Sequence, residues 1–363
     1  MMTNPSYRVV TRTRASGVAG ALAAVLIIAA IVLPAFAGRA VIQDLFFILT
    51  MLTLAQLWNL LAGYGGMVSV GQQAFVGIGA YAMFGAVILW GWDPVPAILV
   101  GGVAALILAV PSAYFAFRLQ GAYFAIGTWV TAEITRLLIA QWKTLGGGTG
   151  TSLPREATSD IAGVAFVRDL FGVREAAARD ILAYWLALGL AVLTIAAIYL
   201  LLRNRLGLAL AAVRDNTEAA KSIGVDAARM KWFVYLIASF GTGLTGALIY
   251  MQTARISPDA AFSVTNWTAY VIFIVVIGGI GCIEGPIIGV LVFYALQSTL
   301  SGYGSWYLLT LGLIAIAVML FAPRGLWGLI AGRTQLALFP IRRRLDTLPS
   351  PQAQAKTGAE RSK

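Results

Sequence analysis

Apolar stretches long enough to cross a lipid bilayer fill most of this 363-residue sequence, and they limit its fold more than any other feature. Crossing ~30 Å of hydrocarbon takes about 20 mostly apolar residues in a helix. Hydrophobic residues make up 60% of the chain and charged residues only 11%, whereas soluble domains are nearer a quarter charged. The sequence therefore predicts an all-α polytopic membrane protein with about ten transmembrane helices, over residues 18–37, 41–62, 72–90, 94–116, 121–141, 181–202, 232–253, 267–283, 285–301 and 305–322.

Two segments leave the span count open. Several glycines and a proline crowd residues 278–286, at the junction between the eighth and ninth ranges. The first range follows an arginine-rich start and ends in Ala35-Phe36-Ala37, which is also typical of a signal peptide with its cleavage site. Its apolar stretch is longer than a usual signal core, so we favour an uncleaved first helix.

Basic residues set the orientation, because Lys and Arg accumulate in cytoplasmic loops. Eighteen of the 26 lie before the first range, after the fourth, in the loop after the sixth, or after the last. This places both termini in the cytoplasm. The predicted parts are a cytoplasmic segment 1–17, a permease domain 18–332 with an external loop 143–180 and a cytoplasmic loop 203–231, and a disordered cytoplasmic tail 333–363. The external loop carries five basic and five acidic residues, and residues 163–180 are expected to hold a short interfacial helix.

The residues that most enzymes and metal sites use are scarce. The chain has no histidine and one cysteine, Cys282, so no metal site, disulfide or Ser–His or Cys–His pair is expected. It also lacks the glycine–lysine loop that binds nucleotide phosphates, so any ATP would be bound by partner subunits and this chain is expected to hold no cofactor. Its net charge of +11 could suggest nucleic acid or anionic lipid as a partner, but the distribution of the basic residues favours topology as the cause. The expected surroundings are membrane lipid, and no nucleic acid is expected as a partner.

The loop 203–231 contains a short polar helix signal between two apolar ranges. Asp215 suits the N-cap and Glu218 stands three residues later, a variant of the capping box. Gly224 suits the position after the helix, where a positive φ is needed. Asp226 is then expected to cap a further helix that continues into the seventh range. A polar helix over 216–223 cannot lie in hydrocarbon, so it offers a rigid contact to a partner in water.

This loop resembles the central loop of LivM-type branched-chain amino acid permeases of ABC importers. The resemblance rests on residues 203–225, including the EAA–G pattern Glu218-Ala219-Ala220 and Gly224, and on residues 71–81, 121–128 and 277–281. Together these motifs cover roughly residues 40 to 330. Gln73 stands where the family usually has a small or basic residue, and Cys282 replaces a usual serine. Both departures are expected to affect which substrate is transported. Permeases for urea and short amides share the same motifs.

The resemblance implies a permease of the type II ABC importer class in a bacterial inner membrane. Its implied partners are a second homologous permease, two cytoplasmic ABC ATPases and an external substrate-binding protein. The residues expected to couple the permease to the ATPases are Arg214, Asp215, Asn216, Glu218, Ala219, Ala220 and Gly224. A rival reading from another class is an ion-coupled secondary amino-acid transporter, which would need an ion site at mid-membrane.

Six polar residues within or beside apolar ranges are candidates for the translocation pathway. Polar groups in a span favour an interior or wet face. Gln56, Asn59, Gln72 and Gln73 fit this role, although hydrogen bonds between helices explain them equally well. Glu133 and Arg136 share one helix face, so they are either pathway residues or a self-neutralised pair near the outer end of the fifth range. The glycines of residues 63–79 permit close helix packing or a broken helix lining a cavity.

Overall fold

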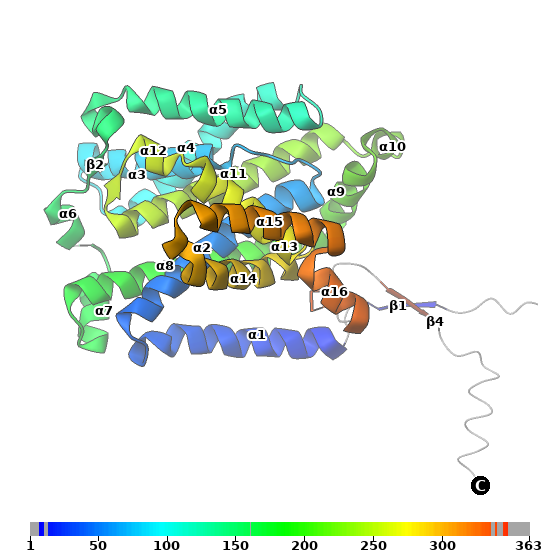
Figure 1. Cartoon of the computed structure of the whole chain (residues 1–363), viewed down its shortest axis with the longest axis horizontal. Helices are drawn as coiled ribbons and strands as arrows, with labels where there is room; N and C mark the ends of the chain where they lie inside the picture. Colours follow the sequence, from blue (N-terminus) through cyan, green and yellow to red (C-terminus); the bar gives the residue numbers. More distant parts are fainter. Residues whose placement is uncertain (1–6, 11–13, 160, 335–337, 340–343, 348–363) are drawn as a thin grey trace, which may run out of the picture.

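Each predicted apolar range contains a helix. The computed structural model describes residues 7–10, 14–159, 161–334, 338–339 and 344–347. The helices in the predicted ranges are α1 (Arg14–Val32), α2 (Arg39–Asn59), α3 (Gln72–Trp90), α4 (Pro94–Ala116), α5 (Ala122–Ala140), α8 (Glu175–Arg203), α11 (Ala227–Thr253), α13 (Tyr270–Gly278), α14 (Glu284–Leu300) and α15 (Ser305–Phe321). They form a bundle with α1 along one edge and α5 along the opposite edge (Figure 1).

Seven helical stretches in the described residues are long and apolar enough to cross a membrane, which makes the chain a multi-pass membrane protein. They are Arg39–Tyr64, Gln72–Trp90, Pro94–Ala116, Glu175–Arg203, Ala227–Thr253, Pro258–Gly278 and Trp306–Arg333. Gly20–Ala35 and Glu284–Leu300 are shorter apolar helices. Because Glu133 and Arg136 lower its hydropathy, α5 is outside this set. The count of ten therefore stays a prediction.

Helix boundaries differ from the sequence-based ranges where short elements join a long one. The stretch predicted to start at 267 begins earlier, with α12 (Pro258–Ala261) and a π-helical turn (Thr265–Ala269) leading into α13. A second π-helical turn, Leu60–Tyr64, extends α2. Short 3-10 turns lie at Leu33–Ala35, Lys143–Leu145, Gly147–Thr149 and Ser301–Tyr303.

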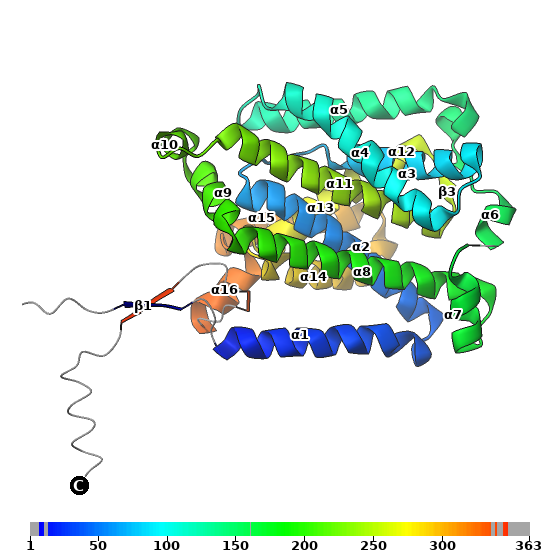
Figure 2. The same cartoon turned by 180° about the vertical axis from the view of Figure 1, so that it is seen from behind.

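The connecting elements gather at the two ends of the bundle (Figures 1 and 2). One end carries α9 (Arg205–Asp215), α10 (Thr217–Ser222), α16 (Gly325–Thr334) and an antiparallel ribbon of β1 (Tyr7–Val10) with β4 (Arg344–Thr347). The other end carries α6 (Arg155–Ser159), α7 (Val164–Phe171) and a ribbon of β2 (Thr151–Ser152) with β3 (Arg255–Ile256). The loop 203–231 therefore lies at one end and the loop 143–180 at the other.

The helix predicted within residues 163–180 corresponds to α7, and α8 already begins at Glu175, before the predicted start at 181. At the C-terminal end, α16 extends through Thr334. Most of the tail predicted to be disordered, residues 335–337, 340–343 and 348–363, lies outside the described residues, as do residues 1–6 and 11–13 of the N-terminal segment.

Glycines bring α3, α4 and α11 close together at the centre of the bundle. A Cβ placed on Gly79 of α3 would overlap the carbonyl oxygen of Gly243 on α11, and one on Gly101 of α4 would lie 2.5 Å from the carbonyl oxygen of Gly79. A Cβ on Gly246 of α11 would likewise overlap the backbone of Val76. Lipid tails are as apolar as leucine, so helices in a bilayer associate largely through such close backbone packing. The glycines near residue 79 therefore serve helix packing.

Gly79→Ala is expected to destabilise the bundle, because the new methyl group would meet backbone atoms that cannot rotate away. Overpacking of this kind costs about 1–3 kcal/mol. Gly85→Ala on the same helix is the matched control, since its Cβ would meet only the Leu145 side chain, at 3.8 Å. The control should gain slightly from the helix propensity of alanine. Thermal unfolding of the purified protein in detergent checks this; equal midpoints for both variants would refute the packing argument.

Candidate functional site

The short helix α10 is held as a compact unit at one end of the bundle. Asn216 is its N-cap: the Oδ1 atom accepts hydrogen bonds from the backbone N–H of Glu218 and of Ala219, each at 3.0 Å. Ala220 is buried against Val213 of α9 and Ala227 of α11 in a small apolar cluster. This buried residue fixes the helix, while Glu218, Ala219, Lys221 and Ser222 remain exposed.

The prediction that Asp215 caps this helix is wrong. Asp215 is the last residue of α9. The backbone of the following residue, Asn216, is extended (φ −158°, ψ 110°), and the Asn216 side chain, not that of Asp215, reaches the free amides of α10. Glu218 is therefore not the reciprocal member of a capping box. Its carboxylate pairs with Lys221 at 2.8 Å, one turn along the exposed surface. Asp215 instead accepts from the Arg214 guanidinium, at 3.0 and 3.1 Å.

The predictions for the end of α10 are confirmed. Gly224 has a φ of +84°, the left-handed conformation expected after the helix. No other group lies within 4 Å of a Cβ built there, so this position constrains the backbone and not the space around it. Asp226 caps α11 by accepting from the backbone N–H of Arg229 at 3.0 Å. Ile223, which follows α10 directly, is an exposed apolar side chain.

A cavity of about 750 Å³ opens beside α10. Its walls come from three segments that are distant in the sequence. They are residues 66–68 after α2, residues 117–125 of the α4–α5 connection and the start of α5, and residues 216–232 of the loop with the start of α11. Glu218, Lys221 and Lys231 give it a charged rim, and Trp232 and Phe124 contribute apolar wall. The exposed helix and the cavity together form one concave surface.

The four predicted amide side chains are all buried and bond to other parts of the chain. Gln56 donates to the carbonyl of Ile283 at 2.7 Å and Asn59 to that of Cys282 at 2.8 Å. Gln72 donates to the carbonyl of Leu54 at 3.0 Å, and Gln73 accepts from the Thr268 hydroxyl.

The amides therefore fall into two groups. Gln56 and Asn59 meet at the loop 281–283, whereas Gln72 and Gln73 join α3 to α2 and to the π-helical turn before α13. In this conformation all four hold helices and loops together. A pathway role for them remains a proposal.

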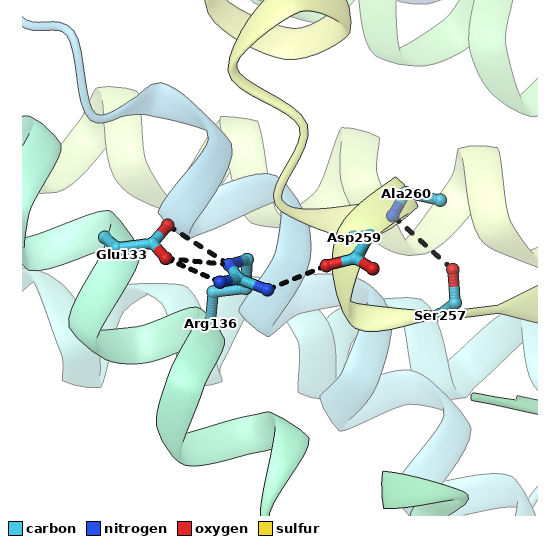
Figure 3. A network of polar contacts seen from close by, with 5 residues as sticks. All are labelled: Glu133, Arg136, Ser257, Asp259 and Ala260. Carbon is cyan, nitrogen blue, oxygen red and sulfur yellow. Dashed lines mark hydrogen bonds and ion pairs between the residues drawn. The ribbon is translucent and has the colours of Figure 1, made fainter. Parts of the chain in front are cut away.

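Glu133 and Arg136 form an ion pair, as their spacing predicts. Figure 3 shows the guanidinium between two carboxylates: it contacts Glu133 at 2.6 Å and Asp259 of α12 at 2.7 Å. The Glu133 side chain is 44% exposed and that of Asp259 81% exposed, so the group lies on the surface of the described chain. This geometry favours the self-neutralised pair over an interior pathway residue, and the third member was not expected.

The buried carboxylate of Asp180 joins three helices, although in the sequence it is only one of the acidic residues of the loop 143–180. Asp180, near the start of α8, has a side chain only 5% exposed. It accepts from Arg39 Nε and Gln43 Nε2 of α2, the latter at 3.0 Å, and from Gln252 Nε2 of α11 at 3.0 Å. The sequence feature that could have indicated this cluster is the spacing of Arg39 and Gln43, which stand one helical turn apart at the start of an apolar helix.

Asp180→Ala is expected to lower the stability of the bundle by about 1–3 kcal/mol, because three donors lose their acceptor together. Arg39 is partly exposed and will recover some hydration, so the lower half of this range is expected. Asp169→Ala is the control: that carboxylate is 71% exposed and, among the described residues, pairs only with its neighbour Arg168. Thermal unfolding in detergent compares the two, and an Asp180 variant as stable as the control would exclude a structural role for this cluster.

Comparison with known proteins places this arrangement in a family. A family model described as branched-chain amino acid transport system / permease component matches residues 40–323. The high-affinity branched-chain amino acid transport system permease protein LivM of Salmonella typhimurium is 29% identical over 337 residues, covering 81% of this chain and 77% of that protein. Its Escherichia coli counterpart is 28% identical over the same length and shares. The probable LivM of Methanocaldococcus jannaschii is 27% identical over 235 residues, 64% of this chain and 60% of that protein.

No solved structure matches the chain. The family model nevertheless covers the helices from α2 to α15, the loop that carries α10, and the buried amides that contact the loop 281–283. Because the match extends over far more than half of the sequence, this chain belongs to the permease-component family of branched-chain amino acid transport systems.

Proposed function

We propose that the chain is the membrane-spanning permease subunit of an ABC importer for branched-chain or related amino acids. The observation that carries the proposal is α10, a capped polar helix exposed between two long apolar helices of a permease-family chain. Separate ATPase subunits would bind this helix and drive transport. The full assembly would contain a second homologous permease, two cytoplasmic ABC ATPases and an external substrate-binding protein.

The concave surface beside α10 suits a protein partner. Ile223 supplies an exposed apolar contact, and Glu218 and Lys221 supply a charged pair next to it. The cavity behind them offers room for a side chain or loop from the ATPase. In this scheme, closure of the ATPase pair displaces α10, and the displacement reorients the permease helices between outward-open and inward-open states.

The charges at the two ends of the bundle support a proposed orientation in the membrane. The end with α10 carries many of the basic residues, including those of the loop 203–231. The end with α6 and α7 carries the loop with balanced charge. We place the first end in the cytoplasm of a bacterial inner membrane, with both termini there, and α6 and α7 outside. Ten spans in the type II importer arrangement are consistent with this placement.

A topology reporter fused after Arg203 is expected to report cytoplasm, and a reporter inserted within residues 146–160 is expected to report the external side. The physical reason is the retention of Lys and Arg on the cytoplasmic face. Alkaline phosphatase and a fluorescent protein, which are active on opposite sides of the membrane, provide the measurement. The reverse pattern would place α10 on the side of the membrane where no ATP is available. The coupling proposal would then be wrong.

Gly224→Val is expected to abolish transport while leaving membrane insertion intact. A β-branched residue at a φ of +84° costs about 1–2 kcal/mol locally, enough to displace the end of a six-residue helix. Gly224→Asn is the matched control, because asparagine tolerates the left-handed conformation. Glu218→Lys also should uncouple, since it breaks the pair with Lys221 and places a cation at the helix N-terminus.

The measurements are copurification of the ATPase subunits and uptake by the assembled transporter. Expected results are weakened ATPase association and lost uptake for Gly224→Val and Glu218→Lys, and near-normal values for Gly224→Asn. Normal association and uptake in the first two variants would mean that α10 is only a surface turn.

The substrate assignment comes from the relatives, which are described as branched-chain amino acid permeases. Uptake of leucine, isoleucine or valine into vesicles containing the complete complex, with urea and acetamide as competitors, tests it. Competition by urea or acetamide would favour the alternative of a urea or short-amide permease.

A further inference from the structure

Arg214, two residues before the N-cap of α10, connects this end of the bundle to its interior. Arg214 is oriented by Asp215, which accepts from its Nε and Nη2 atoms. The remaining Nη1 atom donates to the carbonyl oxygen of Gly63 at 2.9 Å. Gly63 lies in the π-helical turn that ends α2, 151 positions away in the sequence. The loop that carries α10 is thus bonded directly to the end of a largely buried helix.

The end of α2 is suited to this contact. The last carbonyls of any helix lack partners within the helix, so Gly63 has an oxygen free to accept. Turns of π-helix inside longer helices often occur at functional sites. The chain beyond the turn also contacts the same side chain, since a Cβ on Gly66 would lie 3.4 Å from Arg214 Cγ. The end of the π-helical turn and the first residues after it therefore both lie against Arg214.

One turn before Gly63, Asn59 joins α2 to the segment between α13 and α14, which we call the α13–α14 junction (residues 279–283). Its amide uses both atoms: Nδ2 donates to the carbonyl of Cys282 and Oδ1 accepts from the backbone N–H of Gly281, each at 2.8 Å. Gln56, a further turn back, donates to Ile283. Three consecutive residues of the junction are therefore bonded to one face of α2.

Arg214, Gly63 and the junction also lie in direct contact. A Cβ on Gly63 would come within 2.6 Å of the Gly281 nitrogen, and a Cβ on Gly281 would lie 3.5 Å from Arg214 Nη1. The coupling loop, the end of α2 and the α13–α14 junction thus meet at one point. Both contacting positions are glycine, which lets the backbones of α2 and the junction approach closely beside the Asn59 amide.

The junction has the backbone of a hinge. Gly279 and Gly281 have φ values of +129° and +76°, conformations that L residues rarely adopt. A few such residues at helix ends can absorb the large φ and ψ changes of a domain movement. The helices on either side pack tightly, since a Cβ on Gly278 would overlap the carbonyl of Gly285. A force on the junction would therefore move α13 and α14 as a pair.

We propose that Arg214 and Asn59 are positioning residues that transmit the movement of α10 to the α13–α14 junction. Through the hydrogen bond to Gly63 and the amide clamp on Gly281 and Cys282, α10, the end of α2 and the junction move as one unit. A displacement of α10 then rotates α13 and α14 about the glycine hinge. This rests on the proposed function of α10, and it names the route by which that helix acts on the translocation path.

Asn59→Leu in the assembled transporter tests the route. Leucine is close in size to asparagine and removes both bonds to the junction. ATPase association is expected to stay at the native level, because α10 is untouched, while uptake per ATP hydrolysed falls about tenfold, within the range of coupling changes seen for such networks. Arg214→Gln should give the same phenotype. Thr53→Val is the matched control: within the described part of the chain, that buried hydroxyl on α2 bonds only to the carbonyl of Leu49 in its own helix, at 2.8 Å.

Cys282 provides a second readout that needs no substitution. It is the one cysteine of the chain and lies in the junction. Its labelling rate with a small maleimide, followed by mass spectrometry of its peptide, is expected to differ between nucleotide-free and ATP-bound complexes. In Asn59→Leu this difference should disappear although the ATPases still bind.

The outcomes separate the two proposals. If Gly224→Val uncouples the transporter but Asn59→Leu and Arg214→Gln transport normally, α10 couples by another route and this inference is wrong. The inference is also wrong if the Cys282 labelling rate in the native complex is the same with and without ATP. It is wrong as well if Asn59→Leu lowers thermal stability but leaves the ratio of uptake to ATP hydrolysis unchanged. If Gly224→Val itself has no effect, the failure belongs to the proposed function.

Discussion

Backbone amides that lie at membrane depth must find partners inside the protein, and the rest of the structure depends on this requirement. An unpaired amide in hydrocarbon costs several kcal/mol, so lipid-facing segments are helical and any break in a helix must be enclosed by protein. The two main interior breaks, residues 65–71 and 279–283, obey this rule. At the first, Trp58 donates to the Ser69 carbonyl at 2.8 Å and the Val70 N–H donates to the Thr128 hydroxyl at 3.0 Å. At the second, Asn59 and Gln56 supply the partners.

The same requirement explains why the buried amide side chains of this bundle bond to backbone and hydroxyl groups of other helices and loops. Asparagine and glutamine carry both a donor and an acceptor, which lets one side chain replace two lost backbone bonds. Asn59 does this for Gly281 and Cys282. Asp180 applies the same principle with charge: a single carboxylate satisfies donors from α2 and α11. Such groups hold a defined conformation, and where they join two elements across a glycine hinge they also link the movements of those elements.

Close helix packing gives the bundle its rigidity and leaves its ends to partners. The glycine contacts among α3, α4 and α11 form a centre in which the helix backbones touch. The outer helices α1, α5 and α15 expose many large apolar side chains, as expected of surfaces that meet lipid or another permease. The end with α10 instead presents a charged helix and a cavity. A rigid centre would allow a displacement of α10 at that end to move helices elsewhere in the bundle.

The sequence by itself determined the helical class, the location of the apolar helices, the exposed helix in the loop 203–231 and the left-handed conformation of Gly224, because these depend on local hydropathy and backbone sterics. It also placed Glu133 and Arg136 on one helix face, one turn apart, and the structure then showed them paired. Only the tertiary structure decided that Asn216 and not Asp215 caps α10, since that depended on where α9 ends. It alone showed Asp259 beside Arg136, the three helices that meet at Asp180, and the contact of Arg214 and Asn59 with the glycines of residues 63 and 281. These pairs are separated by 70 or more positions, and no local propensity encodes which distant backbone group a buried side chain will reach.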